Sequence, residues 1–385
     1  MSRKVKAAVL TAPNKLETTE FPYPSLKRGG AILKTELSGI CGTDKHTFRG
    51  EVKQYAGTPA EMSTPFPIIQ GHENVGIIEE IDEDGSNNLE FYGQKLRVGD
   101  RVSMYPDVAC GYCWYCKHIH GYPICDNLRS YGNSFSCASE PYLFGGWSQY
   151  IYIIPGVKLY KVPEGLSPEY AVFVELMAVA SSLDKAKEFY SFGGEGFGFG
   201  DTVVIQGVGP VGMMHLIKAR MLGADKIIVI DKHEFRLKIA KEFVADVAIS
   251  LNNTTQEERL KIIHNETEGR GGDVVVECAG DPEAIPEGIE LIRTGGVYIE
   301  VGNFVDCGKI DINTHKLCSK NIRLIGLSNH PITMYGNSMR MMKRYEETFR
   351  FDKLISHRYS IEDAQKAMMK SMEPDSMKVV IDPWK

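Results

Sequence analysis

The sequence predicts a chain of class α/β joined to a mostly-β part, and three observations carry that prediction. Before about residue 176, short β-type runs such as 31–37, 75–81 and 149–154 are separated by Gly, Pro and Asp, which is typical of a compact β domain. After it, apolar strand patterns alternate with helical ones, which indicates a parallel sheet covered on both faces. A glycine-rich turn also separates the first strand and helix of that second part.

The individual elements follow from these periodicities. In the second part we expect strands at 201–207, 226–231, 247–250, 273–279, 296–301 and 322–327. Helical patterns lie between them at 211–222, 235–244 and 255–267. The first part adds a strand at 101–104, and the last sixty residues return to helix and strand, ending in a strand at 377–381.

Composition bounds the kind of protein. The 385 residues are enough for two domains, each with its own core. A net charge of −6 gives no electrostatic reason to expect nucleic acid or an anionic membrane as a partner. No apolar run reaches the roughly 18 residues of a membrane span. Cysteines scattered through apolar runs suit a reducing compartment, so we expect a cytoplasmic protein.

Four cysteines lie within sixteen positions of one another. They are Cys110, Cys113, Cys116 and Cys125. Four thiolates at such short spacing can surround Zn²⁺ as a tetrahedron, whereas neighbours in C-x-x-C rarely meet the geometry of a disulfide. An iron–sulfur cluster is the rival interpretation, but its bacterial run ends in Cys-Pro and Cys125 is followed by Asp126. We therefore predict a structural zinc lobe, in which His118 or His120 is an alternative ligand.

The glycine-rich turn has the pattern of a dinucleotide site. Its residues are Gly207, Val208, Gly209, Pro210, Val211 and Gly212. Such a turn between strand and helix brings the backbone close to a pyrophosphate at the helix N-terminus. Asp231 ends the next strand, where an acid bonds ribose hydroxyls and repels a 2′-phosphate, so NAD is favoured over NADP. Arg236 lies either against the adenine or ribose or in solvent on its helix.

A second set of metal-type residues precedes the four cysteines. Cys41 supplies a thiolate and His72 an imidazole, the ligand types of catalytic zinc, which commonly keeps three protein ligands and an open position. Thr43 and His46 stand two and five residues after Cys41 and form a plausible proton path. Glu175 lies within an apolar run, where a buried carboxylate requires a cation or a proton.

These motifs occur in the order of the zinc-dependent medium-chain dehydrogenase/reductase (alcohol dehydrogenase) family, which the chain resembles from Lys6 to its end. Within the family it is most similar to the sorbitol and threonine dehydrogenase branch. The resemblance implies a GroES-like mostly-β catalytic domain over 1–176 and 328–385. It also implies an inserted Rossmann NAD-binding domain, a doubly wound parallel sheet, over 177–327.

The resemblance also implies residue roles. Cys41, His72 and Glu175 would surround the catalytic zinc, with Glu73 as an outer or exchangeable ligand. Thr43 and His46 match the proton relay of the family. Asp44 matches the acid that orients the histidine ligand, and Lys378 falls where a basic residue meets the pyrophosphate.

The implied activity is reversible oxidation of a secondary alcohol or polyol to its ketone. It would use NAD, one catalytic and one structural zinc, and a small-molecule alcohol or ketone substrate, in a homo-oligomer that is a dimer or tetramer. A zinc-independent enone or quinone reductase and a non-enzymatic nucleotide-binding or redox-sensing protein remain alternatives.

The chain departs from the family pattern at three places. The spacing before Cys125 is one residue longer than the family pattern, and Leu176 replaces the usual proline after Glu175. About ten extra residues at 50–65 are expected to form a loop over the substrate side.

Overall fold

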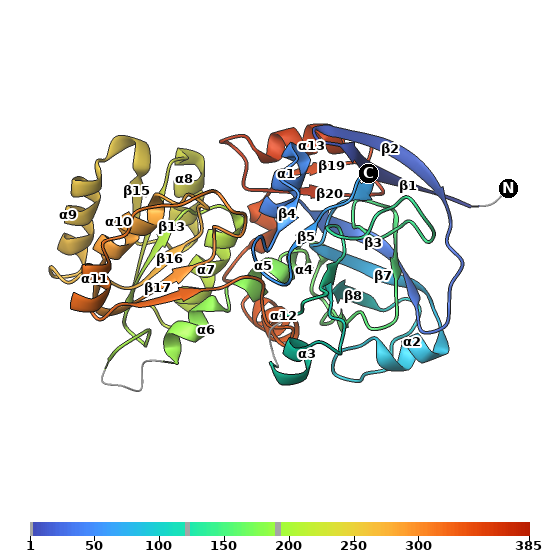
Figure 1. Ribbon diagram of the computed structural model, residues 1–385, viewed down its shortest axis with the longest axis horizontal. Helices are drawn as coiled ribbons and strands as arrows, with labels where there is room; N and C mark the ends of the chain where they lie inside the picture. The colour runs from blue at the N-terminus through green and yellow to red at the C-terminus, as the bar shows by residue number, and fades with distance from the viewer. Residues whose placement is uncertain (1–2, 120–123, 189–193) are drawn as a thin grey trace. The chain divides into compact units, whose positions relative to one another are not determined.

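The computed structural model describes residues 3–119, 124–188 and 194–385, which form two units. Unit 1 contains Met1–Glu175 and Pro331–Lys385, and unit 2 contains Leu176–His330. Both ends of the chain therefore build unit 1, and the segment between them builds unit 2 (Figure 1).

Unit 1 is mostly β. Its strands are β1 (Lys4–Ala12), β2 (Lys15–Pro22), β3 (Ala31–Gly39), β4 (Lys53–Gln54), β5 (Met62–Ser63), β6 (Ile68–Ile69), β7 (Asn74–Ile81), β8 (Arg101–Met104), β9 (Asp107–Val108), β10 (Arg129–Ser130), β11 (Tyr150–Ile153), β12 (Leu159–Lys161), β19 (Ile355–Tyr359) and β20 (Lys378–Ile381). Its helices are α1 (Gly42–Arg49), α2 (Glu83–Asn88), α3 (Trp114–His118), α4 (Pro168–Ala171), α12 (Met334–Arg344), η2 (Phe351–Leu354) and α13 (Ala364–Ser371). Helix α5 (Val174–Val179) begins in unit 1 and ends in unit 2.

The larger sheet of unit 1 joins both ends of the chain. Its strand order is β12-β8-β7-β3-β20-β19, and β11 also pairs with β3. Strand β3 pairs antiparallel with β7, so that Ser38 lies opposite Asn74, and β20 pairs with the same end of β3. The segments that leave β3, enter β7 and enter β20 therefore meet at one end of the sheet.

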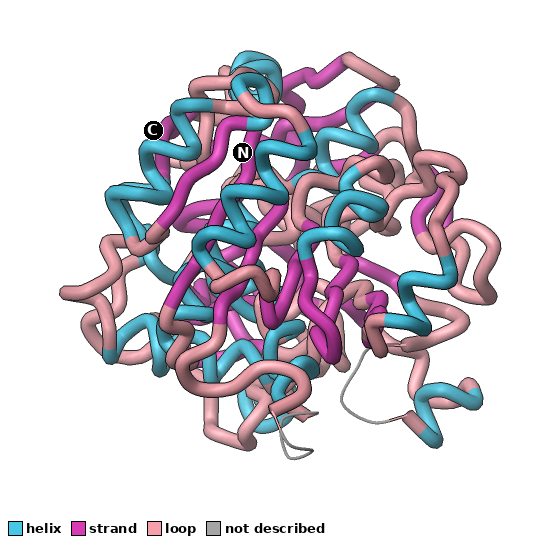
Figure 2. The backbone as a smooth tube through the Cα atoms, turned by 90° about the vertical axis from the view of Figure 1, so that its left-hand side faces the viewer, coloured by secondary structure: helices cyan, strands magenta, loops and turns pink. Residues whose placement is uncertain are grey.

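Unit 2 is a parallel α/β layer structure. Its elements are α6 (Ser182–Lys187), β13 (Thr202–Gln206), α7 (Pro210–Met221), β14 (Lys226–Asp231), α8 (Glu234–Phe243), β15 (Val247–Ser250), η1 (Leu251–Asn253), α9 (Gln256–Glu266), β16 (Gly272–Glu277), α10 (Ala284–Leu291), β17 (Ile292–Glu300), α11 (Thr314–Ser319) and β18 (Arg323–Gly326). The strand order is β15-β14-β13-β16-β17-β18, all parallel. Figure 2 faces this unit and shows its helices beside the strands.

The sequence of unit 2 explains this sheet. Strands β13 and β16 are buried at every residue, because helices cover both faces of a parallel sheet. Helix α7 contacts α6 and α8, whereas α9 contacts α10. The chain order reverses between β13 and β16, and ligands of such sheets bind beyond the carboxyl ends of the strands at that point.

Most predicted elements lie within one or two residues of their observed bounds, and the strands at 226–231 and 247–250 have the predicted bounds. Strand β17 begins four residues before its prediction. The segment 50–65, expected as a loop, contains the two-stranded hairpin of β4 and β5. In the described ranges, no helix combines the length and apolar character needed to cross a bilayer.

Candidate active site and metal centres

The four predicted thiols of the cysteine lobe do come together. One sulfur from each of Cys110, Cys113, Cys116 and Cys125 lies within 4.8 Å of the others. The Cys110–Cys116 and Cys113–Cys116 sulfur separations are 3.9 and 3.4 Å. A tetrahedron with zinc–sulfur bonds of about 2.3 Å has sulfur separations of about 3.8 Å. The donor set therefore fits one zinc ion.

Backbone N–H groups surround these sulfurs. Cys125 Sγ accepts the N–H of Cys110 and of Asn127 at 3.3 Å each. Burial opposes ionisation of the Cys110 thiol, but the N–H groups of Tyr112 and Cys113 outweigh it and lower the pKa of Cys110 to about 6. The thiolate form that binds metal is therefore favoured at Cys110, whereas burial raises the pKa of Cys116 and Cys125.

The histidine alternative at this lobe has a different environment. The His118 ring stacks on Trp114 at 4.6 Å, and its Nδ1 lies 2.7 Å from the Trp114 carbonyl oxygen. His118 is not part of the four-thiol group. His120 lies outside the described residues.

The second cluster forms where β3 ends and β7 begins. Cys41 is the N-cap of α1, and its N–H donates to Asp44 Oδ2 at 2.8 Å. Asp44 Oδ1 lies 3.7 Å from His72 Nδ1, within the antiparallel corner made by β3 and β7. Burial raises the pKa of Asp44, although His72 and the Cys41 N–H oppose the shift. The structure thus places the Asp44 carboxylate beside the His72 ring, and its orienting role stays a prediction.

Cys41, His72 and Glu73 present their ligand atoms within 4.8 Å of one another. Thiolate, imidazole and carboxylate are all ligands of zinc. Glu73 Oε1 is buried and accepts no hydrogen bond from any described residue, so the cluster has an acceptor that a cation would satisfy. These residues fit a metal ion with mixed ligands.

Lys378 lies beside this cluster. Its ammonium forms an ion pair with Glu73 and donates to the Ile40 carbonyl oxygen at 3.1 Å, with 1 % of its side chain exposed. A Cβ on Gly39 would overlap Glu73 Oε2, so glycine is required there. The structure gives Lys378 a buried partner in unit 1, and its contact with a pyrophosphate stays a prediction. The pairing of β20 with β3 brings it there.

Glu175 stands at the start of α5, within electrostatic reach of His72 and Glu73. Its Oε2 is buried. Burial raises the pKa of Glu175 to about 7, while His72 opposes the shift. Burial also disfavours the charged form of His72, but Cys41 and Asp44 outweigh it and raise the pKa of His72. The site therefore concentrates negative charge around one imidazole.

The predicted relay residues follow Cys41 on α1. Thr43 Oγ1 lies 3.9 Å from Cys41 Sγ. His46 Nδ1 contacts Glu51 Oε2, just beyond the end of the helix at Gly50. Gly50 has a φ of 94°, the left-handed conformation that ends many helices. Glu51 belongs to the extra segment 50–65, and in the sequence only its position just after this helix indicates the contact.

The glycine-rich turn of unit 2 has the conformation that its pattern predicts. Gly207 has a φ of 87°, and a Cβ there would lie 2.7 Å from Ala279. Asp231 Oδ2 accepts the N–H of Val208 at 2.8 Å, so the acid at the end of β14 contacts the turn directly. A Cβ on Gly209 would lie 3.5 Å from the Arg236 guanidinium. Asp231 and Arg236 therefore flank the turn in this structure.

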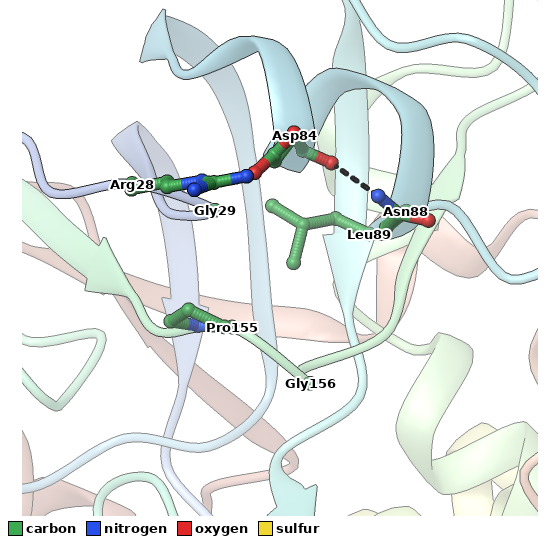
Figure 3. A pocket seen from close by; sticks show the side chains of 7 residues that line it. All are labelled: Arg28, Gly29, Asp84, Asn88, Leu89, Pro155 and Gly156. Carbon is green, nitrogen blue, oxygen red and sulfur yellow. Dashed lines mark hydrogen bonds and ion pairs between the residues drawn. The ribbon is translucent and has the colours of Figure 1, made fainter.

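A separate cavity of about 330 Å³ lies in unit 1 between α2 and two loops (Figure 3). Arg28, Asp84 and Pro155 are among the residues that line it. None of its lining residues belongs to either cysteine-containing cluster. The cavity contains no candidate chemistry.

Comparison with known proteins places both units in one family. The model of the "Alcohol dehydrogenase GroES-like domain" matches residues 27–164, and that of "Zinc-binding dehydrogenase" matches 210–344. The chain is 33 % identical to 5-exo-hydroxycamphor dehydrogenase of Pseudomonas putida over 98 % of both chains. It is 28 % identical to sorbitol dehydrogenase of Bacillus subtilis over 99 % of this chain and 98 % of the relative.

A solved structure agrees. An alcohol dehydrogenase of Thermotoga maritima superposes with a TM-score of 0.86 and 32 % identity, over 99 % of both chains. The predicted α/β fold with a GroES-like part is therefore confirmed. This chain belongs to the zinc-binding alcohol dehydrogenase family and is an oxidoreductase of alcohol or polyol CH–OH groups.

Proposed function

We propose that the chain oxidises a secondary alcohol or polyol with NAD, with unit 1 as the catalytic domain and unit 2 as the NAD-binding domain. The observation that carries this is the mixed Cys41–His72–Glu73 cluster, which has Thr43 beside the thiol. Zinc bound there supplies the Lewis acidity that acidifies an alcohol, and NAD supplies the hydride acceptor.

The chain's own residues provide the proton path. Thr43 Oγ1 receives the alcohol proton and hands it on towards His46. The contact of Glu51 with His46 Nδ1 positions the imidazole at the outer end of this path. Asp44 would act through His72, because its carboxylate lies 3.7 Å from Nδ1 and would attract the N–H of that nitrogen without touching substrate.

We propose two metal ions per chain, one in each cluster, because the two donor sets share no residue. Metal analysis of the purified, fully active protein should give two zinc ions per chain. A single zinc in fully active protein would refute the structural zinc in the cysteine lobe.

We propose NAD as the preferred cofactor because Asp231 stands buried beside the glycine-rich turn. Its carboxylate would accept hydrogen bonds from the ribose hydroxyls and repel a 2′-phosphate. Asp231→Ser should weaken NAD binding by about 1.5–3 kcal/mol, the contribution of a hydrogen bond to a charged group, and should relax discrimination against NADP. Wild-type kinetics that clearly prefer NADP would contradict the assignment.

The substrate class follows from relatives and from the hairpin. The similar proteins are named for hydroxycamphor and sorbitol, a ring alcohol and a polyol. Tyr105 lies within electrostatic reach of both Tyr55, in the β4–β5 hairpin, and Glu175. We propose that this hairpin borders the substrate; a surface excursion or subunit contact is the competing role. Deleting 52–61 should reorder the substrates and raise KM while both zinc ions remain.

We also propose a cytoplasmic homo-oligomer, a dimer or tetramer, from the family resemblance. Sedimentation of the purified chain gives its oligomeric state, and fractionation of its source cells gives its compartment. A monomer at micromolar concentration would contradict the first proposal, and recovery outside the cytoplasm would contradict the second.

An assay of NAD reduction over a panel of secondary alcohols and polyols, with and without a zinc chelator, tests the main proposal. We expect activity that the chelator removes and zinc restores. Chelator-resistant reduction of enones or quinones would favour the zinc-independent alternative. Nucleotide binding without turnover of any substrate would favour a non-enzymatic role.

A further inference from the structure

Two glutamates end neighbouring strands at the carboxyl edge of the sheet in unit 2. Glu277 ends β16 and Glu300 ends β17, and the strand register places them directly opposite each other. Asn303 Nδ2 lies 3.3 Å from Glu277 Oε2 and 3.0 Å from Glu300 Oε1. One amide nitrogen therefore touches both carboxyl groups, which must lie close together.

This cluster has more acceptors than donors. Glu300 Oε2 and Asn303 Oδ1 are buried and receive no hydrogen bond from any described residue. Neither carboxyl group forms an ion pair with a lysine or arginine of the described chain. Glu277 is fully buried and Glu300 beside it is half-buried. Two such adjacent carboxylates cannot both ionise cheaply, and one added proton supplies the missing donor.

Glu277 also organises the turn that follows β16. Its Oε1 accepts the N–H groups of Ala279 and Gly280, the latter at 2.9 Å. Ala279 packs against Gly207, where a Cβ would lie 2.7 Å from its backbone. Glu277 therefore holds the turn on which the first glycine of the predicted phosphate-binding motif rests.

We propose that Glu277 and Glu300 share one proton at neutral pH and, with Asn303, form a positioning group for the dinucleotide-binding turn. This inference rests on the proposed NAD binding in unit 2. While the proton is present, the pair carries a single negative charge. When it leaves, the two carboxylates repel each other and the anionic pyrophosphate, so nucleotide binding weakens.

The surroundings support this charge state. Burial, and then Glu300, raise the pKa of Glu277 to about 8. Tyr298 and Cys278 are near, and burial raises the pKa of both. Burial lowers the pKa of His215, 3.6 Å from Cys278, to about 4, so it is neutral here.

The remaining charge that faces this region comes from α10. It is Glu287, which is paired with Arg259 of α9. The Glu277 carboxyl is therefore the group whose pKa lies near 8 at this edge of the sheet.

The test is the NADH dissociation constant of the zinc-loaded protein, without alcohol, at pH 7 and pH 9.5. Glu277→Gln keeps the Oε1 acceptor and imitates the protonated acid. We expect the dissociation constant at pH 9.5 divided by that at pH 7 to be about tenfold larger in wild type than in this variant. A tenfold ratio corresponds to a change of about one unit in the pKa of the group when NADH binds. Glu300→Gln removes the same repulsion and should behave likewise. Glu257→Gln, on exposed α9, should keep the wild-type ratio.

Hydrogen exchange provides a second measurement that needs no nucleotide. The N–H bonds of Ala279 and Gly280 favour the ionised Glu277, so both amides should gain protection above pH 8 in wild type, and Glu277→Gln should show no such gain. Equal ratios and equal protection in all variants would overturn the shared proton while leaving NADH binding intact. A wild type that binds no NADH would overturn the proposed cofactor, and the positioning role with it.

Discussion

The two cysteine-containing clusters of unit 1 contrast in how they are assembled. The four-cysteine lobe takes every ligand from 110–125, and local N–H groups satisfy its sulfurs. The Cys41 cluster joins residues 41, 72 and 73 through the pairing of β3 with β7, and adds Lys378 through β20. Its carboxyl groups are buried and their protonation is perturbed, as at Asp44 and Glu175. Four identical ligands that close the coordination shell are typical of a structural metal site. A mixed ligand set beside carboxyl groups of perturbed pKa is typical of a catalytic one.

The largest effect should come from Cys41→Ser. Loss of the thiolate should remove one metal ion and lower turnover by about 10³-fold or more, because the metal contributes several kcal/mol to the transition state. The fold and the second metal should remain, since the four-cysteine lobe shares no ligand with this cluster. Activity, bound zinc and circular dichroism are the measurements. If the variant unfolds, the Cys41 cluster is needed for the fold as well, and the proposed difference between the two clusters is wrong.

Lys378→Met tests the buried charge that distinguishes the catalytic cluster. It leaves Glu73 buried without its cation, and breaking such a pair costs about 3–5 kcal/mol. Urea unfolding should show this loss in the free energy of unfolding. Adding Glu73→Gln to the variant should recover much of it. Equal stability of wild type and Lys378→Met would mean that the pair is not formed.

Cys113→Ser should act on stability rather than on chemistry. The lobe should lose its metal, and the free energy of unfolding should fall by about 3 kcal/mol. Turnover per folded molecule should stay within a few-fold of wild type at low temperature. If turnover instead falls as far as in Cys41→Ser while the protein stays folded, the roles of the two clusters have been misassigned.

The smallest effect should come from Glu51→Gln. The glutamine side chain can still accept a hydrogen bond from the N–H at His46 Nδ1, but being neutral it no longer stabilises the imidazolium. Because this pair is partly exposed, about 0.2–1 kcal/mol is at stake, so turnover should fall no more than about fivefold. The loss should be greater at low pH, where proton release limits turnover. A matched surface variant, Glu83→Gln on α2, should leave the rate unchanged.

The sequence by itself determined the elements and the local sites. Strand and helix periodicity predicted all six strands of unit 2 and the helices α7, α8 and α9, because apolar runs between helices leave little choice of fold. The helices α6, α10 and α11 were not predicted. The four cysteines were predicted as one site because four thiols within sixteen consecutive residues can bind the same metal ion. The turn at 207–212 was predicted from its glycine pattern, and a Cβ at Gly207 or Gly212 would indeed collide with neighbouring backbone atoms.

Only the tertiary structure decided the partners that are distant in sequence. The ion pair of Lys378 with Glu73 depends on β20 entering the sheet beside β3, and no local pattern encodes that pairing. The Glu277–Glu300 pair likewise exists only because β16 and β17 align in register. The hydrophobic pattern of a strand indicates that the strand is buried, but it does not indicate which strand pairs with it in the sheet. The interactions of buried charged side chains therefore follow from the tertiary structure, because folding brings their partners together.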